Sequence, residues 1–155
     1  MSDGTAPVAT GQTLTPVMTL EAMRAYNAGI PFNVDLGIEI AATDVDGVHL
    51  VLPWQDRFGG SRHKGHMHGG VIASLIDAAC GLSMVLFTGR GAPTIDLRTD
   101  FLRGVGAGEL RARGRVVRLG RTLGSIDAIV HDAAGRHVAS GRAVFSLGHQ
   151  DPPVM

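Results

Sequence analysis

Residues 68–88 have the sequence HGGVIASLIDAACGLSMVLFT, in which a His-Gly-Gly tripeptide opens a long apolar run that carries one carboxylate, Asp77. Over this run the apolar residues cover most of the circumference of an α-helix, which is typical of a helix buried on nearly all sides. Gly89 and the Gly-Ala-Pro segment at 91–93 are expected to end it. The sequence therefore predicts a long central helix that other elements must enclose.

The segments on either side of this helix alternate between polar and apolar residues, as strands with one buried face do. Two such segments precede the helix with Asp46-Gly47 as a hairpin turn, and four follow it, the last two joined at Ala134-Gly135. The predicted strands are 37–44, 48–53, 94–102, 109–119, 122–131 and 136–147, with a short helix at 19–27 capped by Thr19 and stopped at Gly29 and Pro31. Because the apolar helix must be buried, we expect an α+β fold with a single antiparallel sheet wrapped around it.

The length of 155 residues and the hydrophobic content of 45% fit one globular domain, predicted at 17–149 between flexible tails at 1–16 and 150–155. A formal net charge of zero argues against nucleic acid or an anionic membrane surface as a partner. No run approaches the roughly 18 apolar residues of a membrane span, and the first sixteen residues do not resemble a signal peptide. Cys80 is the single cysteine, which excludes an internal disulfide framework and indicates a reducing compartment. We therefore expect a soluble, cytoplasmic protein.

Two features of the central helix suggest a functional site. Free backbone N–H groups at the glycine-rich start of the helix attract negative charge, and a lone carboxylate inside an apolar helix is costly to bury unless it is paired or used. Either feature alone has a structural explanation: the glycines can serve a tight turn, and Asp77 can be satisfied by Ser74 or by a backbone amide. The face that carries Asp77 consists mostly of small residues, which leave room for a ligand: Gly70, Ala73, Ser74, Gly81 and Met84.

The distance along the helix constrains how such a site could be assembled. Gly69 and Asp77 are eight residues apart, or about 12 Å at the rise of an α-helix. Reacting groups must come within roughly 3 Å of one another, so the two cannot easily act together within one chain. Two antiparallel helices related by a twofold axis would bring Asp77 of one subunit to Gly69 of the other. A functional site here predicts a homodimer with two shared sites.

The chain resembles the hotdog-fold acyl-CoA thioesterases, specifically the phenylacetate-pathway (PaaI-like) group. The resemblance rests on His68-Gly69-Gly70, on Asp77 seven residues after the second glycine, on the strand segment 94–103 and on the closing strand 139–147, and it covers about residues 33–147. It implies a hotdog sheet around the central helix, dimers that can pair into tetramers, and hydrolysis of an acyl-CoA thioester. We expect no cofactor.

The resemblance also implies roles for individual residues. The N–H of Gly69, within the turn formed by His68 and Gly70, would polarise the thioester carbonyl, because a helix N-terminus stabilises the negative charge that develops there. Asp77 of the partner subunit would be the nucleophile or the general base that activates water, and desolvation should raise its pKa. His68 is expected to position the glycine turn by a hydrogen bond. Many relatives have an asparagine about six residues before this histidine; here that segment, 61–66, has none, and Gln55 or His63 could take its role.

Further residues are candidates for contacts with the substrate or with CoA. Arg118 and Arg121 suit the phosphates of CoA, although solvated strand arginines are common. Ser74, Asp96 and His63 could reach the substrate, and Trp54, Phe58, Met84 and Phe87 could shape an acyl pocket or simply pack in the core. A metal site at His63, His66 and His68 has unfavourable spacing, and Cys80 is expected to be an inert core thiol.

Two alternatives remain open beside the thioesterase hypothesis. A hotdog dehydratase or hydratase would usually pair a catalytic histidine with a carboxylate. A non-catalytic acyl-CoA-binding or regulatory protein could keep the fold without turnover, and the absent asparagine is compatible with this. The acyl group, aryl or short to medium chain, is left open by the sequence.

Overall fold

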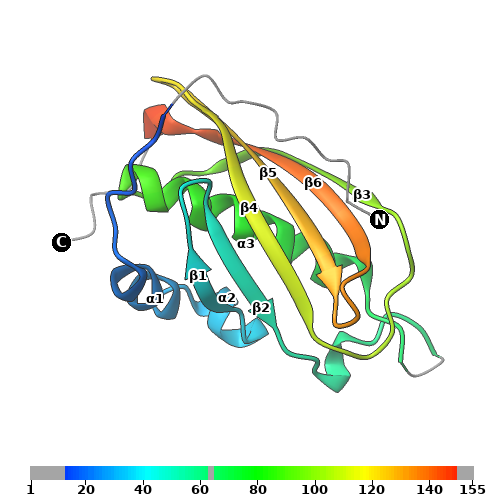
Figure 1. The fold of residues 1–155 in the computed structure, drawn as a ribbon. Helices are drawn as coiled ribbons and strands as arrows, with labels where there is room; N and C mark the ends of the chain where they lie inside the picture. The colour runs from blue at the N-terminus through cyan, green and yellow to red at the C-terminus, as the bar shows by residue number, and fades with distance from the viewer. Residues whose placement is uncertain (1–12, 63–64, 150–155) are drawn as a thin grey trace.

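The computed structural model describes residues 13–62 and 65–149, which form one six-stranded antiparallel sheet curved around a long helix (Figure 1). The helices are α1 (Leu20–Ala28), α2 (Pro31–Leu36) and α3 (Gly69–Thr88), and the strands are β1 (Glu39–Thr43), β2 (Val48–Leu52), β3 (Thr94–Phe101), β4 (Leu110–Leu119), β5 (Leu123–Asp132) and β6 (His137–Ser146), with short 3-10 turns at Asp56–Phe58 and Leu147–His149. The predicted fold class and the six predicted strands are confirmed.

The central helix α3 forms where the sequence predicts it. His68 is the N-cap, Gly89 ends the helix in the left-handed conformation with φ of 67°, and most of the residues between them are buried. By length and apolar composition alone α3 could cross a membrane, contrary to our expectation that no run approaches that limit. The structure instead buries most of this helix against the sheet, so its apolar character is that of a core helix.

The sheet can approach α3 closely because a glycine lies at the centre of β4. A Cβ at Gly114 would lie 2.2 Å from Ser83 Oγ and 2.3 Å from the Ala79 carbonyl oxygen of α3. On either side of this contact, buried and more exposed residues alternate along β4 as predicted, and Ala112 and Val116 are buried. Gly114 therefore sets the helix and the sheet at backbone-to-backbone distance.

The strand order departs from the order along the chain. It is β1-β2-β4-β5-β6-β3, so β3, which follows α3 directly, crosses to the far edge and pairs with β6 (Figure 1). Within residues 13–62 and 65–149, this crossover leaves one side of β3 without a strand neighbour. The open edge lies beside the N-terminal half of α3, because a Cβ at Gly69 would lie 3.3 Å from the ring of Phe101 at the end of β3.

A second helix follows α1, where the sequence predicted only a stop. The helix α1 begins after Thr19, whose hydroxyl accepts from the Ala22 N–H, and it ends at Gly29 as predicted. Pro31, interpreted as part of that stop, occupies instead the first turn of α2, a position that suits proline because its missing N–H would have no partner there. The described residues before α1 include Leu14 and Met18, which are partly buried against the core.

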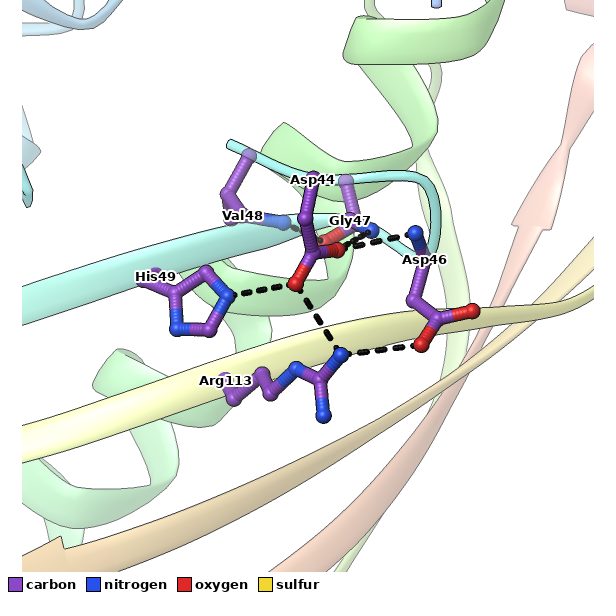
Figure 2. Close-up of polar contacts among 7 residues, drawn as sticks. Asp44, Asp46, Gly47, Val48, His49 and Arg113 are labelled. Carbon is purple, nitrogen blue, oxygen red and sulfur yellow. Dashed lines mark hydrogen bonds and ion pairs between the residues drawn. The ribbon is translucent and has the colours of Figure 1, made fainter. Parts of the chain in front are cut away.

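The β1–β2 hairpin is held by a cluster of ionic contacts around Asp44 (Figure 2). Asp44 Oδ1 accepts from the N–H groups of Asp46 and Gly47, and Asp44 Oδ2 lies 2.7 Å from His49 Nε2 and 3.0 Å from Arg113 Nη2 of β4. Burial alone would raise the pKa of Asp44, but these contacts outweigh it and lower the pKa to about 2. The cluster therefore fixes the predicted Asp46-Gly47 turn and ties it to β4.

We expect Asp44→Asn to lower the free energy of unfolding by about 1 kcal/mol at pH 7, because Asn keeps one acceptor for the turn amides but loses the charge that faces His49 and Arg113. Since the folded pKa lies below the usual value of 3.8, the wild-type contribution is complete above about pH 4 and is lost as the pH falls toward 2. Urea unfolding at pH 7, 4 and 2.5 measures this. Asp46→Asn, which loses only the contact with Arg113, is the control and should have a smaller effect. Equal stability of Asp44→Asn and wild type at pH 7 would contradict this role for Asp44.

Candidate active site

A cavity of about 220 Å³ lies between α3, the α1–α2 segment and the start of β3. Its lining combines apolar side chains with several polar groups in nearly equal measure. Helix α3 contributes the face that begins at Asp77 and continues through small and apolar side chains. The lining residues are Tyr26, Ile30, Asn33, Asp77, Ala78, Gly81, Leu82, Met84, Val85, Gly91, Ala92, Thr94 and Phe145.

Of the described residues that line the cavity, Asp77 is the one carboxylate. It is half-buried, and its Oδ1 accepts a hydrogen bond of 3.0 Å from the Thr94 hydroxyl. Burial raises the pKa of the Asp77 carboxyl above its usual range, and the bond from Thr94 offsets this only in part. Among the described residues no donor faces Asp77 Oδ2, so this oxygen is available to a water molecule or a substrate. The carboxylate is therefore suited to act as a base, and the partners considered from the sequence, Ser74 or a backbone amide, are not the ones it has.

The first residue of α3 presents an unused backbone donor. The Gly70 N–H donates to His68 Nδ1 at 2.9 Å, and the Val71 N–H donates to the His68 carbonyl oxygen at 3.0 Å. The hydrogen bond predicted to let His68 position the glycine turn is thereby confirmed. The Gly69 N–H has no acceptor among the described residues. Of the two glycines, Gly69 is therefore the one whose N–H can bind a negatively charged oxygen, while Gly70 serves the cap.

The cap also explains why position 70 favours glycine. A Cβ at Gly70 would lie 2.9 Å from His68 Nδ1, so a side chain there would push the imidazole out of its bond with the helix. At position 69 the tight neighbour is the Phe101 ring, 3.3 Å from the place of a Cβ. Close contacts therefore restrict side chains at both positions, but only the contact at position 70 involves the helix cap.

Asp77 and Gly69 of α3 both contact β3, but at opposite ends of that strand. Thr94, at the start of β3, contacts Asp77, and Phe101, at its end, lies against Gly69. The eight residues of α3 between the two groups correspond to about 12 Å, so one chain does not bring them together.

Strand β3, at the open edge of the sheet, carries exposed apolar side chains. Ile95 is 57% exposed and Phe101 is 54% exposed, and further exposed apolar residues in or next to this strand are Leu97 and Leu102. A bare, apolar edge strand is prone to pair with another strand. This edge is therefore typical of a surface that pairs with another strand and not of one that faces solvent.

Asp96 and Arg118 lie on the face of the sheet opposite to the cavity. Phe145 lines the cavity and is paired with Thr94, whereas Asp96 is paired with the next residue along β6, Val144. Successive residues of a strand point to opposite faces, so Asp96 points away from α3. Arg118 belongs to the same outward row, because it is paired with Ser125, which is paired with Val144. Neither residue reaches the cavity of its own chain.

The other predicted contact residues are distributed around the site. The Ser74 hydroxyl donates to the Gly70 carbonyl oxygen at 2.8 Å, and Ser74 does not line the cavity. Arg121 is exposed in the β4–β5 turn, at the same end of the sheet as Thr94, because Leu119, Gly124, Phe145 and Thr94 form one row of paired residues. His63 lies outside the described residues.

Gln55, considered from the sequence as a replacement for the asparagine of many relatives, is hydrogen-bonded elsewhere in its own chain. The Gln55 amide donates to the Leu36 carbonyl oxygen at 2.8 Å and accepts from Arg57 Nε at 2.8 Å, so both of its ends are engaged beside α2. In residues 13–62 and 65–149 no group of histidine, cysteine or acidic side chains has an arrangement that could hold a metal ion.

The structure separates the residues expected to shape an acyl pocket. Met84 lines the cavity, whereas Phe58 and Phe87 are buried in the core and Trp54 packs edge-on against Phe58. Cys80 is fully buried, and burial raises the pKa of its thiol, which agrees with an inert core residue.

Sequence reasoning missed three polar residues of the cavity: Thr94, Tyr26 and Asn33. Thr94 was recognised only as the start of a strand. Asparagine is unfavourable inside a helix unless its side chain has a specific partner, so Asn27 in the predicted helix at 19–27 carried a weak signal, whereas Asn33 lay beyond that helix and carried none.

Comparisons with known proteins show which proteins this chain resembles. A family model described as the thioesterase superfamily matches residues 64–139. The chain is 30% identical over 135 residues to the medium/long-chain acyl-CoA thioesterase YigI of Escherichia coli strain K12, a match that spans 77% of this chain and 86% of YigI.

Solved structures give the same result. A protein of the thioesterase superfamily superposes with a TM-score of 0.79 at 35% identity, over 82% of this chain and 96% of the other. A thioesterase of Haemophilus influenzae superposes with a TM-score of 0.74 over 89% and 98% of the two chains, and at 24% identity this likeness supports the fold alone.

Proposed function

The chain belongs to the thioesterase superfamily and is a thioester hydrolase of that family, and from this premise we propose that it cleaves acyl-CoA thioesters at sites shared between two subunits. The observation that carries the proposal is the half-buried Asp77 carboxylate in the wall of the cavity next to α3, where burial raises its pKa. In this proposal the cavity holds the acyl group and Asp77 acts at the thioester carbon. The family relative YigI is named for medium/long-chain acyl-CoA, which supports acyl-CoA as the substrate class.

The proposed chemistry has two routes that start from the same ground state. As a general base, Asp77 takes a proton from a water molecule, whose oxygen attacks the thioester carbonyl carbon; as a nucleophile, Asp77 attacks that carbon itself and water hydrolyses the resulting anhydride. In both routes the carbonyl oxygen gains negative charge, which the Gly69 N–H at the positive end of α3 stabilises. The C–S bond then breaks, CoA leaves as the thiolate, and the acyl group leaves as the free acid.

The placement of β3 favours a twofold dimer as the active form. Thr94 marks the Asp77 end of β3, and Phe101 marks the Gly69 end. Antiparallel pairing of two β3 edges therefore sets the Asp77 end of one subunit beside the Gly69 end of the other. The exposed apolar side chains along this edge supply the surface that such pairing would bury. We include a homodimer, which can pair further into a tetramer, in the proposal.

Contacts with the CoA moiety are proposed for Arg121, since it is exposed at the end of the sheet where Thr94 lies. A cytoplasmic location also belongs to the proposal, because the single cysteine is a buried free thiol, as is usual in reducing compartments.

Turnover of an acyl-CoA panel tests the proposed function. The panel contains aryl, short-chain and medium-chain esters, with phenylacetyl-CoA among the aryl members, and a thiol-reactive dye follows the release of CoA. We expect catalysed release from at least one class, with a kcat in the usual range of about 1–10³ s⁻¹. If CoA esters bind to the protein but none is hydrolysed, the protein is an acyl-CoA-binding member of the fold and the proposed activity is wrong.

A further inference from the structure

The ring of Phe101, at the end of β3, lies directly on the start of α3. A Cβ at Gly69 would lie 3.3 Å from two carbon atoms of this ring, so the ring packs against the bare backbone of the helix. Phe101 is nevertheless 54% exposed. A large apolar ring that is packed on one side and open on the other is suited to contact a second group, because burial of its open side is favourable.

The ring projects from the face of the sheet that is turned toward α3. Phe101 is paired with Ala139 of β6, and residues opposite each other on antiparallel strands point to the same face. Ala139 is fully buried, and a Cβ at Gly141, two residues further along β6, would lie 2.6 Å from the Ile76 side chain of α3. Residues two apart on a strand share a face, so Ala139 and Phe101 both face α3. A strand added to the edge of β3 would lie in the plane of the sheet, whereas the ring projects out of that plane.

The ring also lies beside the backbone donor that the proposed chemistry uses. The Gly69 N–H is attached to the same Cα as the position that meets the ring, and it has no acceptor among the described residues. A thioester oxygen that accepts from this N–H therefore comes close to the ring. In a site shared between subunits, Phe101 and Gly69 come from one chain and Asp77 from the other.

We propose that Phe101 is a substrate-contacting residue of the shared site, where its ring packs beside the thioester and excludes water from the Gly69 N–H. This inference rests on the proposed function and adds a residue to that same site. The described lining of the cavity within one chain includes Asp77 and Thr94 but not Phe101, so the ring completes the site only across the dimer.

The expected effect of the ring is on the rate of the chemical step. A hydrogen-bond donor acts more strongly on a developing negative charge when water is excluded, because the local dielectric is low. The ring also offers the thioester sulfur a favourable sulfur–aromatic contact. We expect Phe101→Ala to lower kcat by about tenfold to hundredfold, which is less than the loss expected when the N–H itself is removed.

The first test compares Phe101→Ala with Leu97→Ala, which shortens another exposed apolar side chain in the middle of the same strand. Both changes remove surface from β3 and can weaken the dimer, so kcat is measured at protein concentrations where sedimentation shows each variant to be dimeric. Phe101→Leu, which keeps an apolar side chain without the ring, replaces Phe101→Ala if the latter stays monomeric. Phe101→Ala should show the loss of kcat, and Leu97→Ala should match wild type. Equal kcat values for the two variants would assign Phe101 to the dimer contact alone and overturn the proposal.

A second test asks which subunit supplies the ring to a given site. In a dimer of one Asp77→Asn chain and one Phe101→Ala chain, one site combines an intact Asp77 with the intact Gly69 and Phe101 of the other chain. Random exchange of subunits should therefore raise the activity to about a quarter of that of wild type. If the ring instead acted with Asp77 of its own chain, the mixture would not exceed the average of the two unmixed variants, and the proposal would be wrong.

A binding measurement separates this inference from the proposed function. S-alkyl-CoA thioethers keep the sulfur but cannot be hydrolysed, and calorimetry gives their Kd values for wild type, Phe101→Ala and Leu97→Ala. A Kd that rises about tenfold in Phe101→Ala and not in Leu97→Ala supports the contact even if wild type hydrolyses no ester. In that case only the proposed hydrolysis fails. Equal Kd values for wild type and Phe101→Ala overturn the inference.

Discussion

Asp77→Asn is expected to lower kcat for acyl-CoA hydrolysis by about 10²- to 10⁴-fold while the protein stays folded. The carboxylate is the group that takes the proton or attacks the carbonyl carbon, and the amide can do neither. The fold should tolerate the change because Asn is isosteric and its oxygen can still accept the hydrogen bond from Thr94. Steady-state release of CoA, with circular dichroism and thermal unfolding on the same samples, measures both parts of this prediction.

The pH profile of kcat/KM provides an independent check on Asp77. Because burial raises its pKa, activity in wild type should decline on the acid side at a pH above the usual range for aspartate. The hydrogen bond from Thr94 lowers this pKa, so Thr94→Val should move the acid limb to still higher pH. Full activity of Asp77→Asn, or an acid limb that Thr94→Val does not move, would show that Asp77 is not the ionising group.

Gly69→Pro is expected to reduce kcat by about 10²- to 10³-fold, the usual cost of removing one donor from an oxyanion site. Gly69 is the first residue of α3, where proline is accommodated because the N–H has no helical partner. His68 already has the extended backbone that a following proline requires, with φ of −67° and ψ of 133°. The substitution thus removes the N–H from a helix start that can accept proline.

Gly69→Ala is the matched control for this variant. It places the same Cβ 3.3 Å from the Phe101 ring but keeps the N–H. The proline variant should therefore be much less active than the alanine variant when both are assayed on one substrate. Similar activity of the two would assign any loss to the contact with Phe101 and would remove Gly69 from the proposed chemistry.

Mixing the two inactive variants tests whether each site is shared between subunits. In a dimer of one Asp77→Asn chain and one Gly69→Pro chain, one site combines both defects, and the other combines an intact Asp77 with an intact Gly69. Random exchange of subunits should then restore about a quarter of the wild-type activity. Sites contained within single chains would give no recovery, because each chain would carry one defect.

The central helix was predictable because its signals are local. The run from His68 to Thr88 is apolar around most of its circumference, and the residues that start and end it are adjacent in sequence. The Asp46-Gly47 turn and the alternation along each strand are local in the same way. These patterns determined which elements form, and the helical rise alone showed that Gly69 and Asp77 are far apart within one chain.

Other features depend on which element lies beside which. The sequence could not show that β3 crosses to the far edge, since a strand pattern does not name its neighbour. An irregularity between Thr94 and Asp96 shifts the alternation of β3, so that Asp96 points away from α3 of its own chain, which the sequence pattern could not show. Pro31 was interpreted as a stop because proline is equally compatible with the start of another helix.

The sequence by itself thus determined the buried helix, the six strands, and the two groups at Gly69 and Asp77. Only the tertiary structure decided that Thr94 meets Asp77 and that Phe101 meets Gly69 at an open sheet edge. The physical reason is that periodicity and capping depend on residues a few positions apart. Hydrogen bonds and cavities depend instead on side chains that folding brings together from distant segments.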